Sequence, residues 1–297
     1  MKILIAGLVK NIQVKRIREE GLKRGHLVDG CYAEDLAIYA DSQNFKPRLF
    51  GKDITNYDLI YLLVSKRRWE WYTVVLYLRK KYNTIIVNKK NVEPTYPIFL
   101  TPASDYLRLC EKSLPFPKSA VIYSSKVFDL VESKFKYPLI IKPTSGRQGK
   151  DVYKVTDKNM LVKITNGILK KSIAVVVREF IPYDQDIRVF TVGYKAIGAM
   201  RRIPPKGDFR ANISLGGVGE NFDLSKSEGV RILAEKASRI TKTEIAGVDI
   251  VLEKQTGKPY ILEINPGPQF EGFEKYTNVN AAFEIIKYFE GLYNQRV

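Results

Sequence analysis

Near its C-terminus the chain reads AGVDIVL at residues 246–252 and KPYILEINP at residues 258–266, with the polar segment EKQTG between them. Apolar, β-branched runs that flank a short turn-forming segment are typical of a β-hairpin. Asp249 and Glu263 interrupt the two runs. Because an ionised carboxylate in an apolar strand is costly without a positive charge beside it, both acids need a charged partner.

The register of this hairpin decides whether the two acids meet. If the turn is centred on Thr256, Asp249 lies opposite Glu263, and Asn265 shares the face of Glu263. A turn centred half a residue away would move Asp249 to the other face. Two carboxylates and an amide oxygen on one face suit Mg²⁺ that also binds nucleotide phosphates. A solvated face with scattered acids explains the hairpin alone about equally well.

Bulk properties favour a soluble, cytoplasmic protein. The 297 residues suffice for two or three domains. No stretch is long and apolar enough to span a membrane, and Lys2–Ala6 fits a first strand better than a signal peptide. Cys31 and Cys110 suggest no disulfide framework, and the single histidine, His26, argues against His-based acid–base chemistry.

The chain carries 49 Lys and Arg against 32 Asp and Glu, a formal charge of +17. Such a surplus attracts anions. The excess is spread along the chain and forms no basic tail, so a solvated Lys-rich surface is the simpler explanation. The sequence holds no recognised nucleic-acid motif, and nucleic acid is not the expected partner.

Alternating strand and helix patterns fill residues 1–97 and predict a small open parallel sheet. The expected strands are Lys2–Ala6, Leu27–Cys31, Leu59–Val64 and Thr84–Val87, and the expected helices are Gln13–Arg24 and Arg68–Lys81. The proline-containing segment 91–102 is typical of a linker.

A strand ending in lysine runs into a glycine loop further along. Tyr137–Pro143 carries Lys142, and TSGRQGKDV follows at residues 144–152. Glycines let backbone N–H groups surround phosphate oxygens, and the ammonium adds a point charge. The loop is not a Walker A motif, and a plain β-turn would look the same.

Two polar segments flank the next apolar runs. Asp186 and Arg188 precede one run, and Arg202 follows another. The acid suits a ribose hydroxyl, and the guanidinium groups suit phosphate or carboxylate. A polar hairpin rim is the alternative explanation.

The loop GDFRAN at residues 207–212 precedes Gly216 and Gly217. Arg210 and Asn212 are what a developing phosphoryl charge would need. A solvent-exposed loop remains open as the other explanation.

The order of these motifs resembles the ATP-grasp superfamily and, within it, the RimK-like amino-acid ligases. The resemblance covers essentially the whole chain, including residues 15–28 and 271–277. It implies an α/β and α+β fold with three parts: an N-terminal open parallel-sheet domain (1–97), a small central lid (98–177) and a C-terminal domain with a mainly antiparallel sheet and the metal site (178–297).

By position, the resemblance assigns the nucleotide contacts. It implies that Lys142 contacts the phosphates, that Glu179 and Phe180 bind adenine at a hinge, and that Asp186 faces the ribose. The loop expected to close over the phosphates contains Gly146, Gln148 and Gly149.

The resemblance also assigns the reacting centre. It implies that Arg210 and Asn212 reach the triphosphate and act in catalysis. Two Mg²⁺ or Mn²⁺ ions are expected on Asp249, Glu263 and Asn265, in agreement with the hairpin argument. The residues assigned to the substrate are Arg188, Arg202 and Gly217.

The implied reaction is ATP-dependent amide-bond formation through an acyl phosphate. The partners would be an amino acid, with glutamate as one candidate, and a carboxylate on a small molecule, an acidic peptide or a protein tail. Three residues depart from the family pattern: Tyr106 where a lysine is usual, Asp151 where a glycine is frequent, and Leu215 where an arginine is usual. A nucleotide-binding regulator without turnover is therefore the alternative, and a homo-oligomer is left open.

Overall fold

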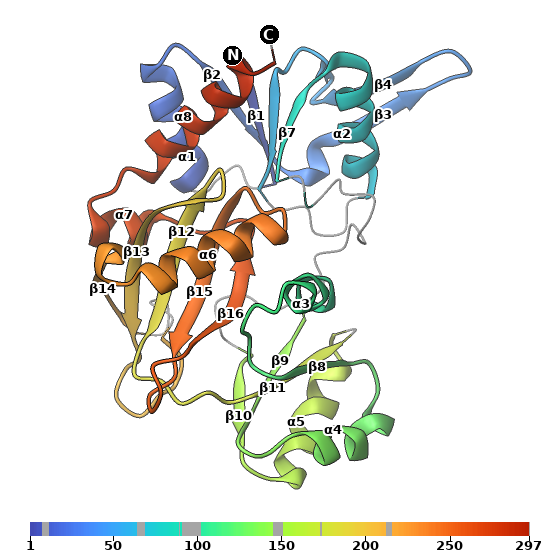
Figure 1. Ribbon diagram of the computed structural model, residues 1–297. Helices are drawn as coiled ribbons and strands as arrows, with labels where there is room; N and C mark the ends of the chain where they lie inside the picture. The colour runs from blue at the N-terminus through green and yellow to red at the C-terminus, as the bar shows by residue number, and fades with distance from the viewer. Residues whose placement is uncertain are drawn as a thin grey trace.

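The structure is a computed structural model, and it describes residues 1–7, 12–63, 69–88, 90, 102–144, 151–172, 174–211 and 216–296. The described strands form four sheets (Figure 1). One is parallel and lies near the N-terminus, whereas the others are antiparallel. None of the helices within these ranges is long and apolar enough to cross a membrane.

The expected parallel sheet is confirmed, with the order β2-β1-β6-β7. Apolar side chains alternate between its two faces, so one face packs on helix α1 and the other on helix α2. The elements are β1 (Lys2–Ala6), α1 (Ile12–Lys23), β2 (Leu27–Cys31), β6 (Leu59–Leu62), α2 (Trp69–Tyr82) and β7 (Ile85–Val87). The segment 91–101 of the expected linker lies outside the described residues.

A small antiparallel sheet, which the sequence patterns do not predict, projects from the parallel one (Figure 1). It follows the short helix η1 (Ala33–Asp35) and contains β3 (Leu36–Ala40), β4 (Phe45–Leu49) and β5 (Lys52–Asp53). Four of the five β3 residues are exposed, so the strand lacks the buried apolar run used to recognise the others.

The last helix, α8 (Ala281–Asn294), returns to the N-terminal sheet and packs beside α1 (Figure 1). Its buried side chains share one core with β1 and β6. Arg24 adds two hydrogen bonds to the Glu290 carboxylate, at 2.9 and 2.7 Å. His26 Nε2 lies 2.8 Å from the same carboxylate. The two ends of the chain thus stabilise one another.

Replacing Glu290 by glutamine is expected to lower the Tm at pH 7 by an amount that shrinks in acid. The Arg24 hydrogen bond lowers the pKa of Glu290 to about 2. A carboxylate whose pKa is lower in the folded state stabilises above its unfolded pKa of about 4.3, and this contribution is lost as the pH falls towards 2. Thermal melts of both proteins from pH 7 to pH 2.5 measure the difference. A gap that stays constant with pH would contradict this assignment.

The central sheet has the order β10-β9-β11-β8, and helices α4 and α5 cover one face. The elements are α3 (Pro102–Glu111), β8 (Ser119–Ile122), η3 (Ser125–Val127), α4 (Phe128–Lys134), β9 (Leu139–Pro143), β10 (Tyr153–Val155), α5 (Lys158–Leu169) and β11 (Val175–Glu179). The expected domain limit between residues 177 and 178 falls inside β11, and the three domain limits stay predictions.

The C-terminal sheet is antiparallel, as expected, with the order β14-β13-β12-β15-β16. Helix α6 covers one face (Figure 1). The elements are β12 (Asp186–Val192), β13 (Lys195–Ile203), β14 (Val218–Phe222), η5 (Leu224–Lys226), α6 (Glu228–Ile240), β15 (Ile245–Leu252), β16 (Pro259–Asn265) and α7 (Glu271–Thr277). The other face, at one end, carries the candidate site.

Candidate functional site

The hairpin of β15 and β16 places Asp249 opposite Glu263, but by a route the sequence does not reveal. Glu253 and Lys258 close the turn, so it is centred between Gln255 and Thr256, not on Thr256. A β-bulge then leaves Leu262 without a partner on β15 and shifts the register by one residue. The prediction of a turn with an odd number of residues, centred on Thr256, is therefore wrong. The bulge nevertheless places Asp249 opposite Glu263.

Core packing explains this bulge. Ile261 and Ile264 are three residues apart, yet both pack in the apolar core beneath α6. In a regular strand they would point to opposite faces. The extra residue lets both stay buried, and it turns Glu263 to the face of Asp249.

Six of the predicted site residues share that face of the sheet, in cross-strand register. Arg202 lies opposite Asp186, Arg188 opposite Asp249, and Asp249 opposite Glu263. Asn265 lies opposite Gly247, where a Cβ atom would stand 2.9 Å from Pro268 and 3.6 Å from Arg188. Glycine at 247 therefore leaves room for Pro268 to pack against this strand.

Two arginines hold the two buried acids. Arg188 donates to both oxygens of Asp249 at 2.7 and 2.8 Å. Arg202 donates to both oxygens of Asp186 at 2.5 and 2.8 Å, and its Nη2 atom lies 2.9 Å from Asp249. Bidentate guanidinium–carboxylate pairs are strong and geometrically specific. The four side chains form a neutral cluster, called here the Arg–Asp cluster.

The cluster sets the charge state of its acids. Burial acts to raise the pKa of Asp249, but the charges of Arg188 and Arg202 outweigh it and lower that pKa. Burial raises the pKa of Asp186, against the opposing charge of Arg202. Arg202 donates one hydrogen bond to each Asp186 oxygen, which leaves about two acceptor positions, and the ribose role of Asp186 stays a prediction.

Glu263 differs from Asp249 because its side chain is 55% exposed. Its Oε2 atom lies 3.3 Å from Lys142 Nζ, at the end of β9 in the central sheet. The Lys142 charge lowers the pKa of Glu263. The structure thus brings the predicted phosphate-binding lysine to the predicted metal-binding carboxylate.

The chemistry of these donors fits a magnesium–nucleotide complex. Glu263 offers an accessible carboxylate, and the Asn265 side-chain oxygen accepts one bond from the Gly267 N–H at 2.9 Å. Asp249 already accepts three bonds, which leaves about one acceptor position. Within the described ranges no group of three or more His, Cys, Asp or Glu side chains is arranged to hold a metal ion by itself, so phosphate oxygens would have to complete a Mg²⁺ shell.

The predicted hinge lies where β11 ends. The N–H groups of Glu179 and Phe180 already donate to Lys118 and Pro138, so these two groups are committed. The rings of Phe180 and Phe209 pack edge to face, with their centroids 6.1 Å apart. Lys154 Nζ lies 3.7 Å from the centroid of the Phe180 ring. The adenine role of Glu179 and Phe180 stays a prediction.

The remaining predicted residues are only partly described. Arg210 is bound to Asp208, with Nη2 to Oδ2 at 2.7 Å, and its predicted role at the triphosphate stays a prediction. Gly217 is buried beside β14. The residues that lie outside the described ranges are Gly146, Gln148, Gly149 and Asn212.

Two cations on the central sheet received no functional role from the sequence. Lys154 and Arg178 both lie in register with Ile140, and Lys142 shares their face, opposite the face covered by α4 and α5. Arg178 follows the apolar run 174–177 directly. A charged residue that ends a buried strand was the available signal.

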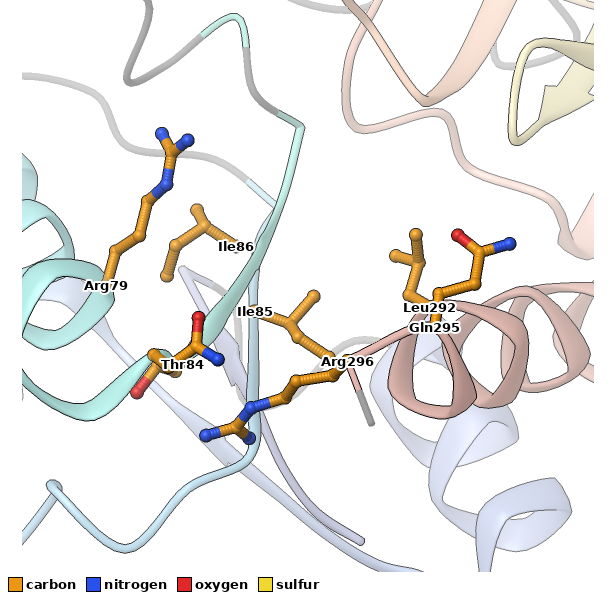
Figure 2. Close-up of a pocket in the computed structure, with 8 residues that line it drawn as sticks. Arg79, Thr84, Ile85, Ile86, Leu292, Gln295 and Arg296 are labelled. Carbon is orange, nitrogen blue, oxygen red and sulfur yellow. The ribbon is translucent and has the colours of Figure 1, made fainter.

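A hollow of about 380 Å³ lies apart from this site, along the outer strand β7 (Figure 2). Arg296 there donates to the Tyr82 carbonyl at 2.8 Å. Its lining contains none of the predicted site residues: it consists of Arg79, Asn83, Thr84, Ile85, Ile86, Leu292, Gln295 and Arg296.

Comparison with known sequences identifies the relatives of this chain. A family model described as a RimK-like ATP-grasp domain matches residues 106–289. A probable alpha-L-glutamate ligase of Vibrio atlanticus (strain LGP32) is 29% identical over 298 residues, which cover 98% of this chain and 95% of that protein. A relative of the same name from Legionella pneumophila (strain Corby) is 29% identical over 286 residues, 93% of this chain and 90% of that protein.

Solved structures share the fold across the whole chain. The ATP-grasp ligase PsnB, complexed with a minimal precursor, aligns with a TM-score of 0.70 at 20% identity, over 99% of this chain and 97% of that one. D-alanine–D-alanine ligase from Bacillus anthracis, complexed with ATP, aligns with a TM-score of 0.71 at 16% identity, over 99% and 98%. At these identities the likeness establishes the ATP-grasp fold.

Proposed function

Since the chain belongs to the RimK-like ATP-grasp family and is a carboxylate–amine ligase, we propose that it adds an amino acid to a carboxylate acceptor through an acyl phosphate. The family match confirms the resemblance drawn from the motifs. Glutamate is the amino acid we propose first, because the full-length relatives are named probable alpha-L-glutamate ligases. The proposed acceptor is a small molecule or an acidic peptide or protein tail, which suits the +17 charge.

The contact between Lys142 and Glu263 carries this proposal. The two residues are 121 positions apart and come from different sheets, yet their charged atoms lie 3.3 Å apart. A lysine for phosphates beside a carboxylate for a cation is the arrangement that a metal–nucleotide complex requires. Asp249 and Asn265 on the same face complete the proposed set.

The proposed reaction has two steps. An acceptor carboxylate oxygen attacks the γ-phosphorus of ATP, the bond to the ADP oxygen breaks, and an acyl phosphate forms. The amine nitrogen then attacks the acyl carbon, phosphate leaves with the electrons of the C–O bond, and the amine releases a proton. Lys142 would hold the phosphates, Arg210 would neutralise charge on the transferring group, and the Asn212 amide would donate a hydrogen bond to it.

We propose that Asp249, Glu263 and Asn265 hold two Mg²⁺ ions. A PsnB structure of the same fold contains Mg and ADP. Bound Mg²⁺ supplies charge neutralisation during phosphoryl transfer. Asp249 would take part only by sharing its carboxylate with Arg188 and Arg202, or by releasing one of them.

Release of ADP tests the proposed activity. The protein is incubated with ATP, Mg²⁺ and each of the common amino acids, alone and with acidic peptides, and products are weighed by mass spectrometry. We expect ADP release that depends on both substrates and a product heavier by one amino-acid residue. Nucleotide binding without turnover for every pair would favour the regulator instead.

A further inference from the structure

Arg178 joins three segments of the molecule at the junction of the central and C-terminal sheets. Its guanidinium donates to Ser119 Oγ at 3.2 Å, to the Leu262 carbonyl at 2.8 Å and to the Tyr106 hydroxyl at 2.8 Å. The residue is 6% exposed. A buried guanidinium persists only when its donors find such partners.

The Leu262 carbonyl belongs to the bulge that positions Glu263. Leu262 is the residue without a partner on β15, so its backbone groups need partners elsewhere. Arg178 supplies one for the carbonyl. The adjacent Ile261 N–H donates outward to the Pro115 carbonyl at 2.9 Å. The edge of β16 that does not pair with β15 is therefore held by Pro115, in the segment after α3, and by Arg178 of β11.

Nucleotide binding would affect the hydrogen bond from Arg178 to Leu262 differently from the neighbouring ion pair of Lys142 and Glu263. Lys142 and Glu263 must separate, at least in part, if one is to bind phosphate and the other a cation. The bond from Arg178 to Leu262 uses a backbone oxygen that neither role needs. It can persist while the ion pair opens.

We propose that Arg178 is a positioning residue for the metal site: it holds the bulge at Leu262, keeps Glu263 opposite Asp249, and ties β11 to β16 when Lys142 releases Glu263. This inference rests on the proposed function. Tyr106 stands where the family usually has a lysine, and its hydroxyl accepts a hydrogen bond from the Arg178 guanidinium. Its ring also stacks on Phe116 at 5.2 Å between centroids.

The test is the magnesium dependence of ADP release in Arg178→Gln. Loss of a group that orients a metal ligand typically costs about 10–100-fold in metal affinity, so the half-saturating Mg²⁺ concentration should rise by about that factor. A Mn²⁺ titration in the presence of ADP measures the change in metal affinity between variants without turnover. Arg178→Lys, which keeps the charge but not three simultaneous bonds, should recover part of the shift.

Matched variants separate positioning from stability. Arg296→Gln removes a guanidinium bonded to a backbone carbonyl far from the site, and its Mg²⁺ midpoint should equal that of the wild type. Tyr106→Phe keeps the ring stack and the Leu262 bond, so we expect a shift below about threefold. If Arg178→Gln fails to fold, Arg178→Lys is measured in the same way.

An unchanged Mg²⁺ midpoint in the folded Arg178 variants, with or without a lower Tm, would overturn the inference. That result leaves the proposed function standing, because the wild type would still turn over. If the wild type itself shows neither ADP release nor metal-dependent ADP binding, the proposed function has failed instead.

Discussion

Glu263→Gln is expected to abolish ATP consumption and to leave the fold intact. The substitution keeps the size of the side chain but removes the charge that a Mg²⁺ ligand supplies. Loss of a residue that merely orients a metal ligand costs about 10–100-fold, so loss of the ligand itself should lower turnover by at least about a hundredfold. Because the side chain is 55% exposed and its ion pair with Lys142 spans 3.3 Å, little stability is lost.

Glu220→Gln is the matched control for this experiment. Glu220 lies on β14 of the same sheet, is 42% exposed and pairs with Arg201. Arg201 points to the face opposite Arg202, because neighbouring residues alternate along a strand. We expect this variant to consume ATP at the wild-type rate. Equal turnover in Glu263→Gln and Glu220→Gln would remove Glu263 from the metal site.

Arg202→Met should cause the largest loss of stability among single changes in the Arg–Asp cluster. Arg202 is 3% exposed and pairs with Asp186 and Asp249. Removing one member of a buried ion pair leaves an uncompensated charge and costs about 3–5 kcal/mol. For a chain of this size that corresponds to a fall in Tm of roughly 10 °C.

The pH dependence of that loss identifies its cause. Burial raises the folded-state pKa of Asp186 above its unfolded value of about 3.9 even beside Arg202, and loss of that opposing charge raises it further. When an acid has a higher pKa in the folded state than in the unfolded state, the protein loses stability as the pH rises. The deficit of Arg202→Met should therefore be larger at pH 8 than at pH 4.5, and adding Asp186→Asn should recover much of it.

Arg201→Met provides the comparison at the adjacent position. Its ion pair with Glu220 is exposed on both sides, and such pairs contribute about 0–1 kcal/mol. Thermal unfolding of Arg201→Met and Arg202→Met at pH 4.5 and pH 8 distinguishes the loss of a buried ion pair from a general effect of removing an arginine. Similar melting temperatures for Arg201→Met and Arg202→Met would contradict the role given to the cluster.

Local patterns in the sequence predict much of this fold. The strands β1 and β6 are short, mostly buried apolar runs, and such runs can be recognised without knowing their neighbours. The strand β3 could not be recognised, because most of its residues are exposed. The return of α8 to the N-terminal sheet depends on packing between distant segments, which no local pattern records.

The candidate site, like the fold, follows in part from local sequence patterns and in part from long-range packing. The hairpin and its two acids follow from residues 246–266, but the bulge at Leu262 does not. Its cause is the common burial of Ile261 and Ile264 beneath α6. Pairing of Arg188 with Asp249 likewise depends on the register between β12 and β15, and this register is set by long-range contacts.

The central claim is that Asp249, Glu263 and Asn265 hold the cations of a nucleotide complex, and Mn²⁺ binding in the presence of ADP tests it most directly. Electron paramagnetic resonance measures free Mn²⁺ during a titration of the wild type and of Glu263→Gln, and needs no knowledge of the substrate. We expect ADP-dependent binding of two Mn²⁺ ions to the wild type and a loss of at least about tenfold in affinity in Glu263→Gln. Identical titration curves for the two proteins would contradict the account.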